Sequence, residues 1–125
     1  MLDNHMYILV GKTAITTGDA LLWAMFMEHE NRQVDRTEIN GVSVSTVFLG
    51  LNHNYWGGVP ILFETMVFGG AYDQYQRRYA TWEEAEQGHK EAVALIEEEQ
   101  RVDDLISNSL KQEDEPNDGS SQGNY

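Results

Sequence analysis

Two apolar runs of β-forming residues, joined by a loop, constrain the fold of this chain more strongly than any other feature. They cover residues 42–51 and 59–68; the first follows Asn40-Gly41, and a Gly-Gly pair follows the second. An Asn-Gly pair next to β-forming residues is a strong signal of a hairpin turn. Apolar side chains fall on both faces of each run, so we predict two central strands with a packed layer on either side.

Three further segments have the composition of strands. Residues 6–10 form a short apolar run that ends at a Gly-Lys turn, residues 31–39 alternate polar and apolar side chains, and residues 72–79 alternate after the Gly-Gly pair. Alternation is typical of strands with one exposed face, and we place residues 31–39 at a sheet edge. The chain therefore predicts an antiparallel sheet of about four to five strands.

Residues 19–30 predict a helix, with Thr16 or Thr17 as the N-cap and Asp19 in the first turn. The segment is almost entirely apolar up to Glu28, which predicts that the helix is largely buried, with another subunit as one candidate for part of the cover. We prefer this interpretation, a core helix, to the alternative of a Met-rich recognition surface.

A second, longer helix is predicted to begin after Thr81. Thr81 and Glu84 have the spacing of a capping box, in which each side chain accepts a backbone N–H at the helix start. The stripe predicted to face the core comprises Trp82, Ala85, His89, Ala92, Val93 and Ile96. A second stripe, offset from the first, comprises Val102, Leu105, Ile106 and Leu110. It extends beyond the core of a small domain, so we expect it to support self-association.

These elements define a single α+β domain over residues 1–111, with one N-terminal helix, the antiparallel sheet and a long C-terminal helix. Residues 97–111 are a helical extension of that domain. Residues 112–125 are polar and acidic, with no large apolar side chain before Tyr125, and are predicted to be disordered.

Acidic residues outnumber basic ones along the whole chain. The sequence has 21 Asp and Glu against 8 Lys and Arg, a net charge of −13, which argues against direct binding to nucleic acid. About half of the excess lies in residues 97–125, with nine acids and two bases. The absence of cysteine excludes disulfides and thiolate sites, and no apolar run is long enough to cross a membrane. We therefore expect a cytoplasmic protein without a membrane partner.

The loop between the two central runs is the first candidate binding site. It contains His53, Asn54, Tyr55 and Trp56, followed by two glycines, and is longer than a tight hairpin requires. Aromatic faces stack on planar rings such as nucleobases, while Asn and His side chains hydrogen-bond to ring edges. The structural alternative is that Trp56 folds back onto the core.

Charged residues on the neighbouring strands are the second candidate. Glu64 lies in an apolar run, where a carboxylate requires a partner such as Arg36, Arg77 or Arg78. We prefer a structural ion pair for Glu64 over a catalytic acid. Arg77, Arg78 and Tyr79 could together hold a phosphate or carboxylate, and we give equal weight to the alternative that one Arg neutralises Glu64 while the other is solvated.

The histidines give little support for a metal site or for catalysis. Glu86 and His89 have the spacing of one di-iron helix motif, but no second motif occurs, so we prefer a partly buried structural His89. Nucleotide-binding, zinc-protease and nucleophile-elbow motifs are absent from the sequence. We predict no metal, no cofactor and no enzymatic activity, with a small hydrolase using Glu64 and His53 as the alternative.

The central hairpin resembles a set of small bacteriophage-encoded proteins. The matching strings are VSTVFLGL (residues 44–51), His53, and PILFETMVF (residues 60–68). The resemblance continues at Arg78-Tyr79, residues 81–85 and Gly88-His89, and in weaker form at Trp23, Arg32, Val34 and Thr37, so that it covers about residues 20–95. The chain departs from the pattern at Asn52, where Asp is common, and at Tyr55-Trp56, which replace a loop richer in Phe and Gly.

This resemblance implies a phage origin and a location in the host cytoplasm, and it brings no catalytic residue. Small phage accessory proteins often inhibit a host defence system, which shifts our expectation toward such a role. We expect a non-catalytic, oligomeric sponge that sequesters a nucleotide-derived signalling molecule through the loop, Glu64 and the Arg-Tyr strand. The alternative is an acidic inhibitor that binds a defence nuclease or effector directly. The net charge of −13 is the observation that supports it.

Overall fold

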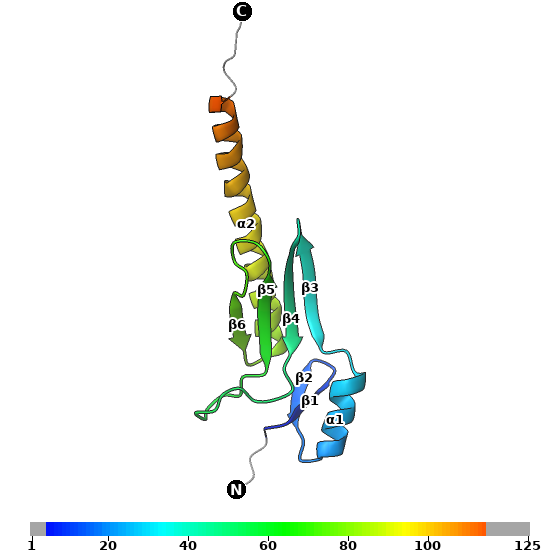
Figure 1. The fold of residues 1–125 in the computed structure, drawn as a ribbon. Coiled ribbons are helices and arrows are strands. Elements are labelled where there is room, and N and C mark those ends of the chain that lie inside the picture. Colours follow the sequence, from blue (N-terminus) through cyan, green and yellow to red (C-terminus); the bar gives the residue numbers. More distant parts are fainter. Residues whose placement is uncertain (1–4, 115–125) are drawn as a thin grey trace, which may run out of the picture.

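The computed structural model describes residues 5–114 and contains two sheets and two helices (Figure 1). The first sheet has two strands and the second has the order β3-β4-β5-β6, with all neighbouring strands antiparallel. The predicted α+β class, with an N-terminal helix, an antiparallel sheet and a long C-terminal helix, is confirmed. The elements are β1 (Tyr7–Val10), β2 (Thr13–Thr16), α1 (Ala20–His29), β3 (Gln33–Ile39), β4 (Val42–Phe48), β5 (Phe63–Phe68), β6 (Gln76–Tyr79) and α2 (Trp82–Asp114).

The turn between β3 and β4 forms as the sequence predicts. Asn40 and Gly41 both have positive φ angles, 49° and 86°, as the two-residue turn of a right-twisted hairpin requires. β3 lies at the sheet edge, and β4 and β5 are the central strands, as expected. The predicted central pair is therefore correct, although both strands are shorter than the apolar runs that indicated them.

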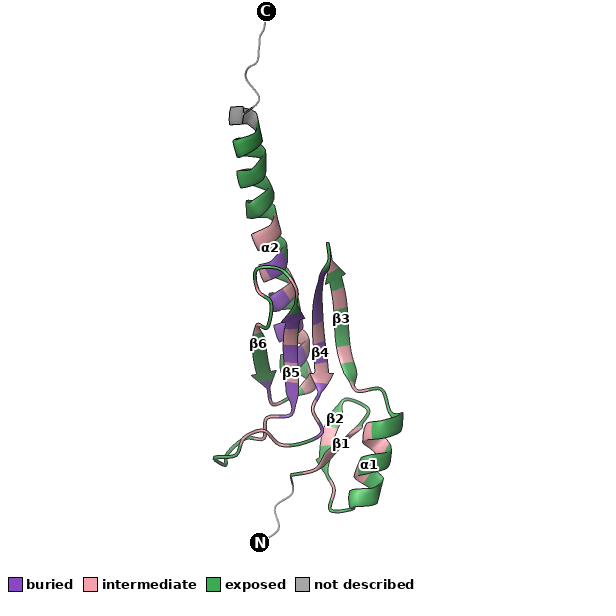
Figure 2. Ribbon diagram, in the orientation of Figure 1, coloured by how far each residue is buried: buried purple, intermediate pink, exposed green. Residues whose placement is uncertain are grey.

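Helix α2 packs across one face of the larger sheet (Figure 1). The strand residues toward α2 are buried and comprise Val42, Val44, Thr46, Phe48, Phe63, Thr65 and Val67 (Figure 2). On the opposite face, Val47 and Met66 are half-buried and Phe68 is exposed. The prediction of packed layers on both faces is thus wrong for the described residues, because the second face mixes these apolar groups with serines and with ion pairs whose side chains are partly exposed.

The N-terminal strands and α1 form a small unit at one end of the larger sheet. Strand β2, which the sequence analysis did not predict, pairs with β1 across the turn at Gly11-Lys12. Two polar side chains join this unit to the sheet end. Trp23 Nε1 donates a hydrogen bond to Gly50 O (2.9 Å), and Arg32 Nη1 donates to Phe48 O (3.1 Å).

Helix α1 differs from its prediction in two respects. Its N-cap is Asp19, whose carboxylate accepts a hydrogen bond from Leu22 N (3.0 Å), so neither Thr16 nor Thr17 caps the helix. None of its residues is buried, so the prediction of a helix buried in the core of this chain is wrong. Burial against another subunit stays a prediction. One side of α1, which includes Trp23, lies against the rest of the chain, and its other sides remain open.

The third predicted strand is shorter than expected. β6 covers only Gln76–Tyr79, whereas residues 69–75 form a turn. Asp73 Oδ1 accepts a hydrogen bond from Gly69 N (2.7 Å), and Tyr75 N donates to Tyr72 O (2.9 Å). The alternation of residues 72–75 therefore reflects a hydrogen-bonded turn that packs tyrosines against the core.

Helix α2 is a single continuous helix of 33 residues. The predicted capping box is confirmed: Thr81 Oγ1 accepts from Glu84 N (3.1 Å), and Glu84 Oε1 accepts from Ala80 N (3.1 Å), one residue before the N-cap. Residues 97–111 are termed the arm. Gln100 Nε2 still donates a hydrogen bond to Ile39 O (3.0 Å) at the end of β3, and the residues after it extend past the sheet (Figure 1). Of the predicted disordered tail, residues 112–114 belong to α2, and residues 115–125 lie outside the described part of the chain.

Candidate functional site

The loop between β4 and β5 is held in shape by asparagine side chains. Asn52 Oδ1 accepts hydrogen bonds from Asn54 N (2.8 Å) and Ile61 N (3.0 Å), which joins the two sides of the loop. Asn54 Nδ2 donates to Val59 O (2.7 Å), and Asn54 Oδ1 accepts from Trp56 N (3.3 Å). Short polar side chains that bond to nearby backbone stabilise turns without a hydrophobic core. Residues 52–59 are termed the aromatic loop.

The aromatic loop exposes its largest side chains. Trp56 is 96% exposed, and Tyr55 is 72% exposed. The alternative in which Trp56 folds back onto the core is therefore wrong. His53 is half-buried; its Nδ1 hydrogen-bonds to Leu51 O (2.9 Å), and its ring centre lies 6.0 Å from that of Tyr55. The indole ring of Trp56 and the phenol ring of Tyr55 are thus largely uncovered by the rest of the chain. Exposing such rings to water is unfavourable, and both are accessible to a partner.

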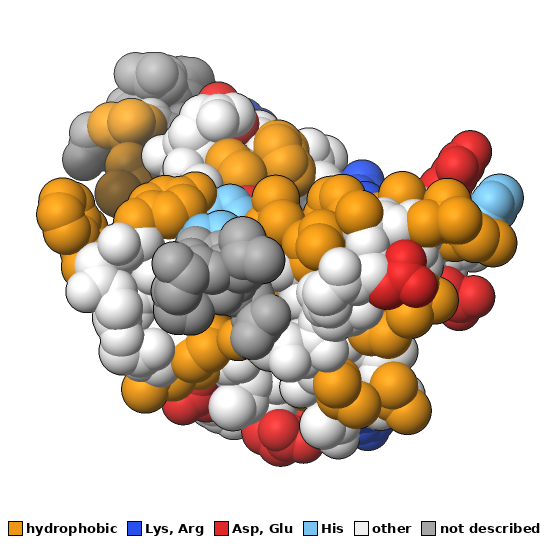
Figure 3. All heavy atoms as spheres, turned by 90° about the horizontal axis from the view of Figure 1, so that it is seen from below, with side chains coloured by type: hydrophobic (Ala, Val, Ile, Leu, Met, Phe, Trp, Pro, Cys, Tyr) orange, Lys and Arg blue, Asp and Glu red, His pale blue; other side chains and the backbone are white. Residues whose placement is uncertain are grey.

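The surface around the aromatic loop is also rich in apolar side chains. Viewed from the end of the molecule that carries the loop, hydrophobic side chains occupy much of the surface (Figure 3). Helix α1 contributes Leu21, Leu22 and Met25, and the β1–β2 hairpin contributes Val10 and Ile15, all of them exposed. Exposed apolar surface of this kind is typical of interaction sites.

The charged residues predicted as the second candidate do not converge. Arg78 Nε lies 3.0 Å from Glu64 Oε2, so the preferred structural ion pair of Glu64 is confirmed. Arg77 Nη1 pairs instead with Glu91 Oε1 of α2 (2.6 Å), and this hydrogen bond is the main cause of the raised pKa of Arg77. Consecutive strand residues point to opposite faces, so Arg77 and Arg78 do not form a joint phosphate site.

Tyr79 points into the core. Its hydroxyl donates to Thr65 Oγ1 (3.1 Å), and burial raises the pKa of Tyr79. The residues predicted to bind a ligand therefore fall into two groups. His53, Asn54, Tyr55 and Trp56 lie together in the aromatic loop, whereas Glu64, Arg77, Arg78 and Tyr79 are engaged by partners within the sheet and α2.

A hollow that the sequence analysis did not predict lies beside the aromatic loop. It has a volume of about 360 Å³ and is bounded by the β1–β2 hairpin, the loop residues Val59 and Pro60, and the start of α2. Lys12 Nζ lies 5.8 Å from the centre of the Trp82 ring. Among residues 5–114, no ion pair joins Lys12 to a carboxylate. No sequence signal links Lys12 to Trp82, because only the tertiary fold brings them together.

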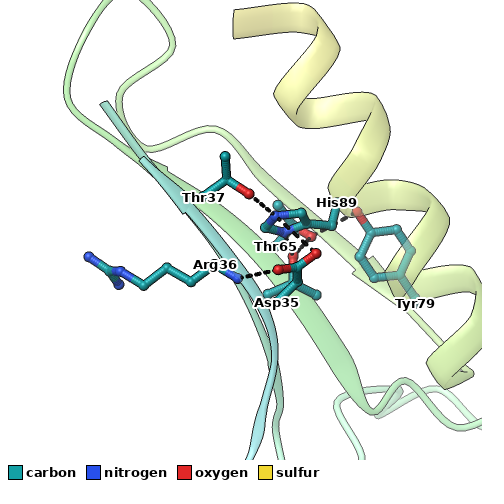
Figure 4. A network of polar contacts seen from close by, with 7 residues as sticks. Asp35, Arg36, Thr37, Thr65, Tyr79 and His89 are labelled. Atoms are coloured by element: carbon teal, nitrogen blue, oxygen red, sulfur yellow. Dashed lines mark hydrogen bonds and ion pairs between the residues drawn. The ribbon is translucent and has the colours of Figure 1, made fainter. Parts of the chain in front are cut away.

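The centre of the molecule contains a chain of polar side chains (Figure 4). His89, only 1% exposed, hydrogen-bonds to Thr46 through Nδ1 (2.7 Å) and to Thr37 through Nε2 (2.9 Å). Thr46 bonds to Thr65, which accepts a hydrogen bond from Tyr79. If each hydroxyl donates to the next group, Tyr79 donates to Thr65, Thr65 to Thr46, and Thr46 to His89 Nδ1. Nδ1 is then an acceptor, so the single ring proton of neutral His89 is assigned to Nε2.

This polar chain is structural. Asp35 Oδ2 lies 3.7 Å from His89 Nε2, and the hydroxyl on the opposite ring nitrogen is that of Thr46, whose side chain is fully buried. The nucleophilic hydroxyl of a catalytic triad must reach the substrate, and the burial of Thr46 prevents this. Burial lowers the pKa of His89, and the Asp35 carboxylate partly opposes this effect. His89 is therefore neutral near pH 7 and joins β3 and β4 to α2, so the preferred structural interpretation of His89 is confirmed, with fuller burial than expected.

Two classes of site find no support in the described part of the chain. Within residues 5–114, no group of three or more His, Asp and Glu side chains is arranged to hold a metal ion. No helix in the same range has the length and the apolar character that spanning a membrane requires.

Comparison of this chain with protein-family models, with curated proteins and with solved structures gave no match. The resemblance to phage-encoded proteins therefore stays a prediction from the motif strings. Those strings include Thr46, Tyr79, Gly88 and His89, and a side chain at Gly88 would collide with the Tyr79 ring. Apart from His53, the strings thus coincide with the scaffold. The chain departs from them within the aromatic loop, at Asn52 and at the exposed Tyr55 and Trp56.

Proposed function

We propose that this protein is a non-catalytic binding protein whose aromatic loop docks onto another protein. The observation that carries the proposal is the nearly complete exposure of Trp56 on a loop fixed by Asn52 and Asn54. Trp and Tyr are among the side chains that contribute most to the free energy of protein interfaces. A loop whose backbone is already ordered also loses less conformational entropy on binding.

A protein partner suits this loop better than a small molecule does. Small-molecule sites are concave and bury most of their ligand, whereas Trp56 projects into solvent. The cations predicted to complete a ligand pocket, Arg77 and Arg78, are paired with Glu91 and Glu64. The alternative function, direct binding of a protein, therefore becomes the leading one.

The proposed partner is a host protein of a bacterial defence system, such as a nuclease or another effector in the host cytoplasm. The resemblance of the central hairpin to phage-encoded proteins supports this class of partner. The net charge of −13 further supports a partner with a basic surface, because complementary charge accelerates association and selects among partners.

The proposal includes a homo-oligomer that forms through α1. Leu21, Leu22 and Met25 are exposed on this helix, and a two-fold contact between two copies would bury all three on each side. Sedimentation velocity tests this interface: the wild type should sediment as an oligomer, and Met25→Glu should shift it toward the monomer. A monomeric wild type would remove self-association from the proposal.

Sequestration of a nucleotide-derived signalling molecule is the second candidate function. It is supported by the hollow beside the aromatic loop, where Lys12 offers a cation that pairs with no carboxylate among residues 5–114, and where Trp82 offers an aromatic ring. A planar ring with an attached phosphate would use both groups. The site of such a ligand is this hollow and not the ion-paired Arg77 and Arg78.

Phage plating on strains that each carry one defence system tests the two candidates together. Expression of the wild-type protein should restore plating on at least one strain, Trp56→Ala should abolish that effect, and Lys12→Ala should retain it. The reverse pattern, together with heat release on titration with cyclic or ADP-ribose-derived nucleotides, would favour sequestration. Failure of the wild type on every strain would refute the proposed role in counter-defence.

Cross-linking identifies whether the loop itself touches the defence protein. Benzoylphenylalanine at position 55, beside Trp56, should form a covalent adduct with a component of the inhibited system on irradiation. The same photoreactive residue at position 10, an exposed apolar site on the β1–β2 hairpin, is the matched control. Equal adduct formation at both positions would contradict docking through the aromatic loop.

A further inference from the structure

The arm lies at the opposite end of the molecule from the aromatic loop and is largely exposed (Figure 2). It carries a stripe of apolar side chains. Val102 is 40% exposed, and Leu105, Ile106 and Leu110 are each 56% exposed. Every residue from 101 to 111 is exposed, so the described chain does not cover this stripe. Helices with one apolar stripe normally place it against another surface.

The charged side chains beside the stripe are mainly carboxylates, and among the described residues no unpaired Lys or Arg lies next to it. Glu98 precedes Val102 by one helical turn and so lies in line with the stripe. The nearest base, Arg101, is already paired with Glu98 (2.6 Å). Lys111 follows Val102 by about two and a half turns, which places it on the opposite side of the helix. The surface that a partner meets along the stripe is therefore apolar and negative.

A hollow forms where the stripe reaches the body of the protein. It has a volume of about 370 Å³, and Tyr72 and Leu95 contribute to its walls. The carboxylates of Glu98, Glu99 and Asp103 also line it, and within the described part of the chain no Lys or Arg does. An arginine side chain fits this environment, because its stem packs on apolar walls while its guanidinium binds carboxylates and stacks on an aromatic ring.

A second copy of the arm does not suit the stripe. Each arm has five acids and two bases over residues 97–111, a net charge of −3. Two stripes in contact would bring the carboxylates of both copies within the screening length of about 8 Å at physiological salt. Charge therefore favours a basic partner over self-association, which we assign to α1.

We infer that the arm binds a basic amphipathic helix of another protein, with an arginine of that helix in the hollow at Tyr72. The apolar face of the helix covers Val102, Leu105, Ile106 and Leu110, and its basic flanks meet Glu99 and Asp103. This surface is separate from the aromatic loop, so the protein presents two docking sites at its two ends. The inference does not depend on the function proposed for the loop.

A model peptide tests this surface directly. The probe is a fluorescein-labelled helix of about 18 residues, five turns, with Leu on one face and Lys and Arg on the other. A scrambled peptide of identical composition has the same charge but no apolar face. Fluorescence anisotropy with the full-length protein should show at least about tenfold tighter binding of the amphipathic peptide, which corresponds to about 1.4 kcal/mol.

Three double variants locate the site of binding. Leu105→Asn with Ile106→Asn keeps the charge and should remove the preference for the amphipathic peptide. Glu99→Gln with Asp103→Asn should weaken binding several-fold. Glu28→Gln with Glu30→Gln, which removes the same charge from exposed positions on and next to α1, should change binding less than about twofold, because charges beyond the Debye length are screened.

Tyr72→Ala and Trp56→Ala complete the test. Tyr72→Ala should weaken the binding of a peptide that contains arginine more than that of its all-lysine counterpart. Trp56→Ala should leave peptide binding unchanged, which separates this inference from the proposed function. Equal binding of amphipathic and scrambled peptides would overturn the inference. So would a wild-type dimer that the Leu105→Asn/Ile106→Asn variant dissociates, because the occupant of the stripe would then be a second copy.

Discussion

The aromatic loop and the arm both expose apolar side chains, but they differ in secondary structure. The loop is an irregular segment whose backbone is fixed by the side chains of Asn52 and Asn54. The arm is a regular helix whose flanks carry carboxylates. A rigid loop with Trp at its tip selects a partner by shape, whereas an acidic helix selects by charge and by helical periodicity. One small domain can thus address two different kinds of surface.

Replacing Trp56 should have the largest effect, because it should impair the aromatic loop and leave the arm unchanged. Trp56→Ala should weaken docking onto the proposed protein partner by about 2 kcal/mol or more, roughly thirtyfold, because Trp is enriched among interface hot spots. Stability should change by less than about 0.5 kcal/mol, since the side chain is 96% exposed. Thermal denaturation and the plating assay measure the two effects. Val10→Ala, at another exposed apolar position, is the control and should change neither.

Asn52 tests whether the rigidity of the loop matters. Asn52→Ala leaves the N–H groups of Asn54 and Ile61 without their acceptor, and should lower the free energy of unfolding by about 1–2 kcal/mol. It should also weaken docking, because the loop then has to become ordered on binding. Asn52→Asp retains the accepting oxygen and should behave like the wild type. Equal loss in both variants would show that the acceptor role is not the reason for the effect.

Acidification tests the stability of the sheet and the packed half of α2, which connect the aromatic loop to the arm. The pKa of buried His89 is lowered below 6.5, so the unfolded chain binds this proton more tightly than the folded protein does. Stability should therefore fall as the pH drops below 6.5 toward the lowered folded pKa. Asp35→Asn removes the charge that raises the pKa of His89 and should steepen this loss. Urea denaturation between pH 7.5 and pH 5.5 measures the free energy of unfolding as a function of pH. The same dependence on pH in Asp35→Asn as in the wild type would contradict this reasoning.

Removal of the arm beyond Arg101 should have the smallest effect on the rest of the molecule. A chain that ends at Arg101 keeps the buried residues of α2, of which Ile96 is the last. Its free energy of unfolding should differ from that of the full chain by less than about 0.5 kcal/mol, and docking through the aromatic loop should persist. Denaturant titration and plating provide the readouts. A large loss of stability would show that the arm belongs to the folding unit and is not a separate docking site.

Local signals in the sequence predicted local structure well. The turn at Asn40-Gly41 and the capping box of Thr81 and Glu84 formed because each depends on the backbone preferences of a few adjacent residues. The burial of α1 was wrong because apolar composition does not tell how much neighbouring surface exists to cover a helix. Strand β2 was missed because Thr13–Thr16 is short and half polar.

The candidate site was predictable only in part. The loop residues were correctly singled out by their type, but their exposure depended on the hydrogen bonds of Asn52, which composition does not reveal. The separation of Arg77 from Arg78 follows from the two-residue period of a strand and was available from the sequence. The meeting of Lys12 with Trp82 was not, since it depends on the placement of the β1–β2 hairpin beside α2.

The continuity of α2 has a consequence for how the arm becomes helical. The first turn of a helix is the unfavourable step, and later residues each add one hydrogen bond. In α2 the packed half, with Ala85, Ala92 and Ile96 in the core, supplies that nucleus. The arm therefore only propagates an existing helix, and it should fray gradually from its far end on warming rather than melt in a separate transition. Amide hydrogen exchange along residues 97–111 would then form a gradient, and a bound partner would set how far the helix extends.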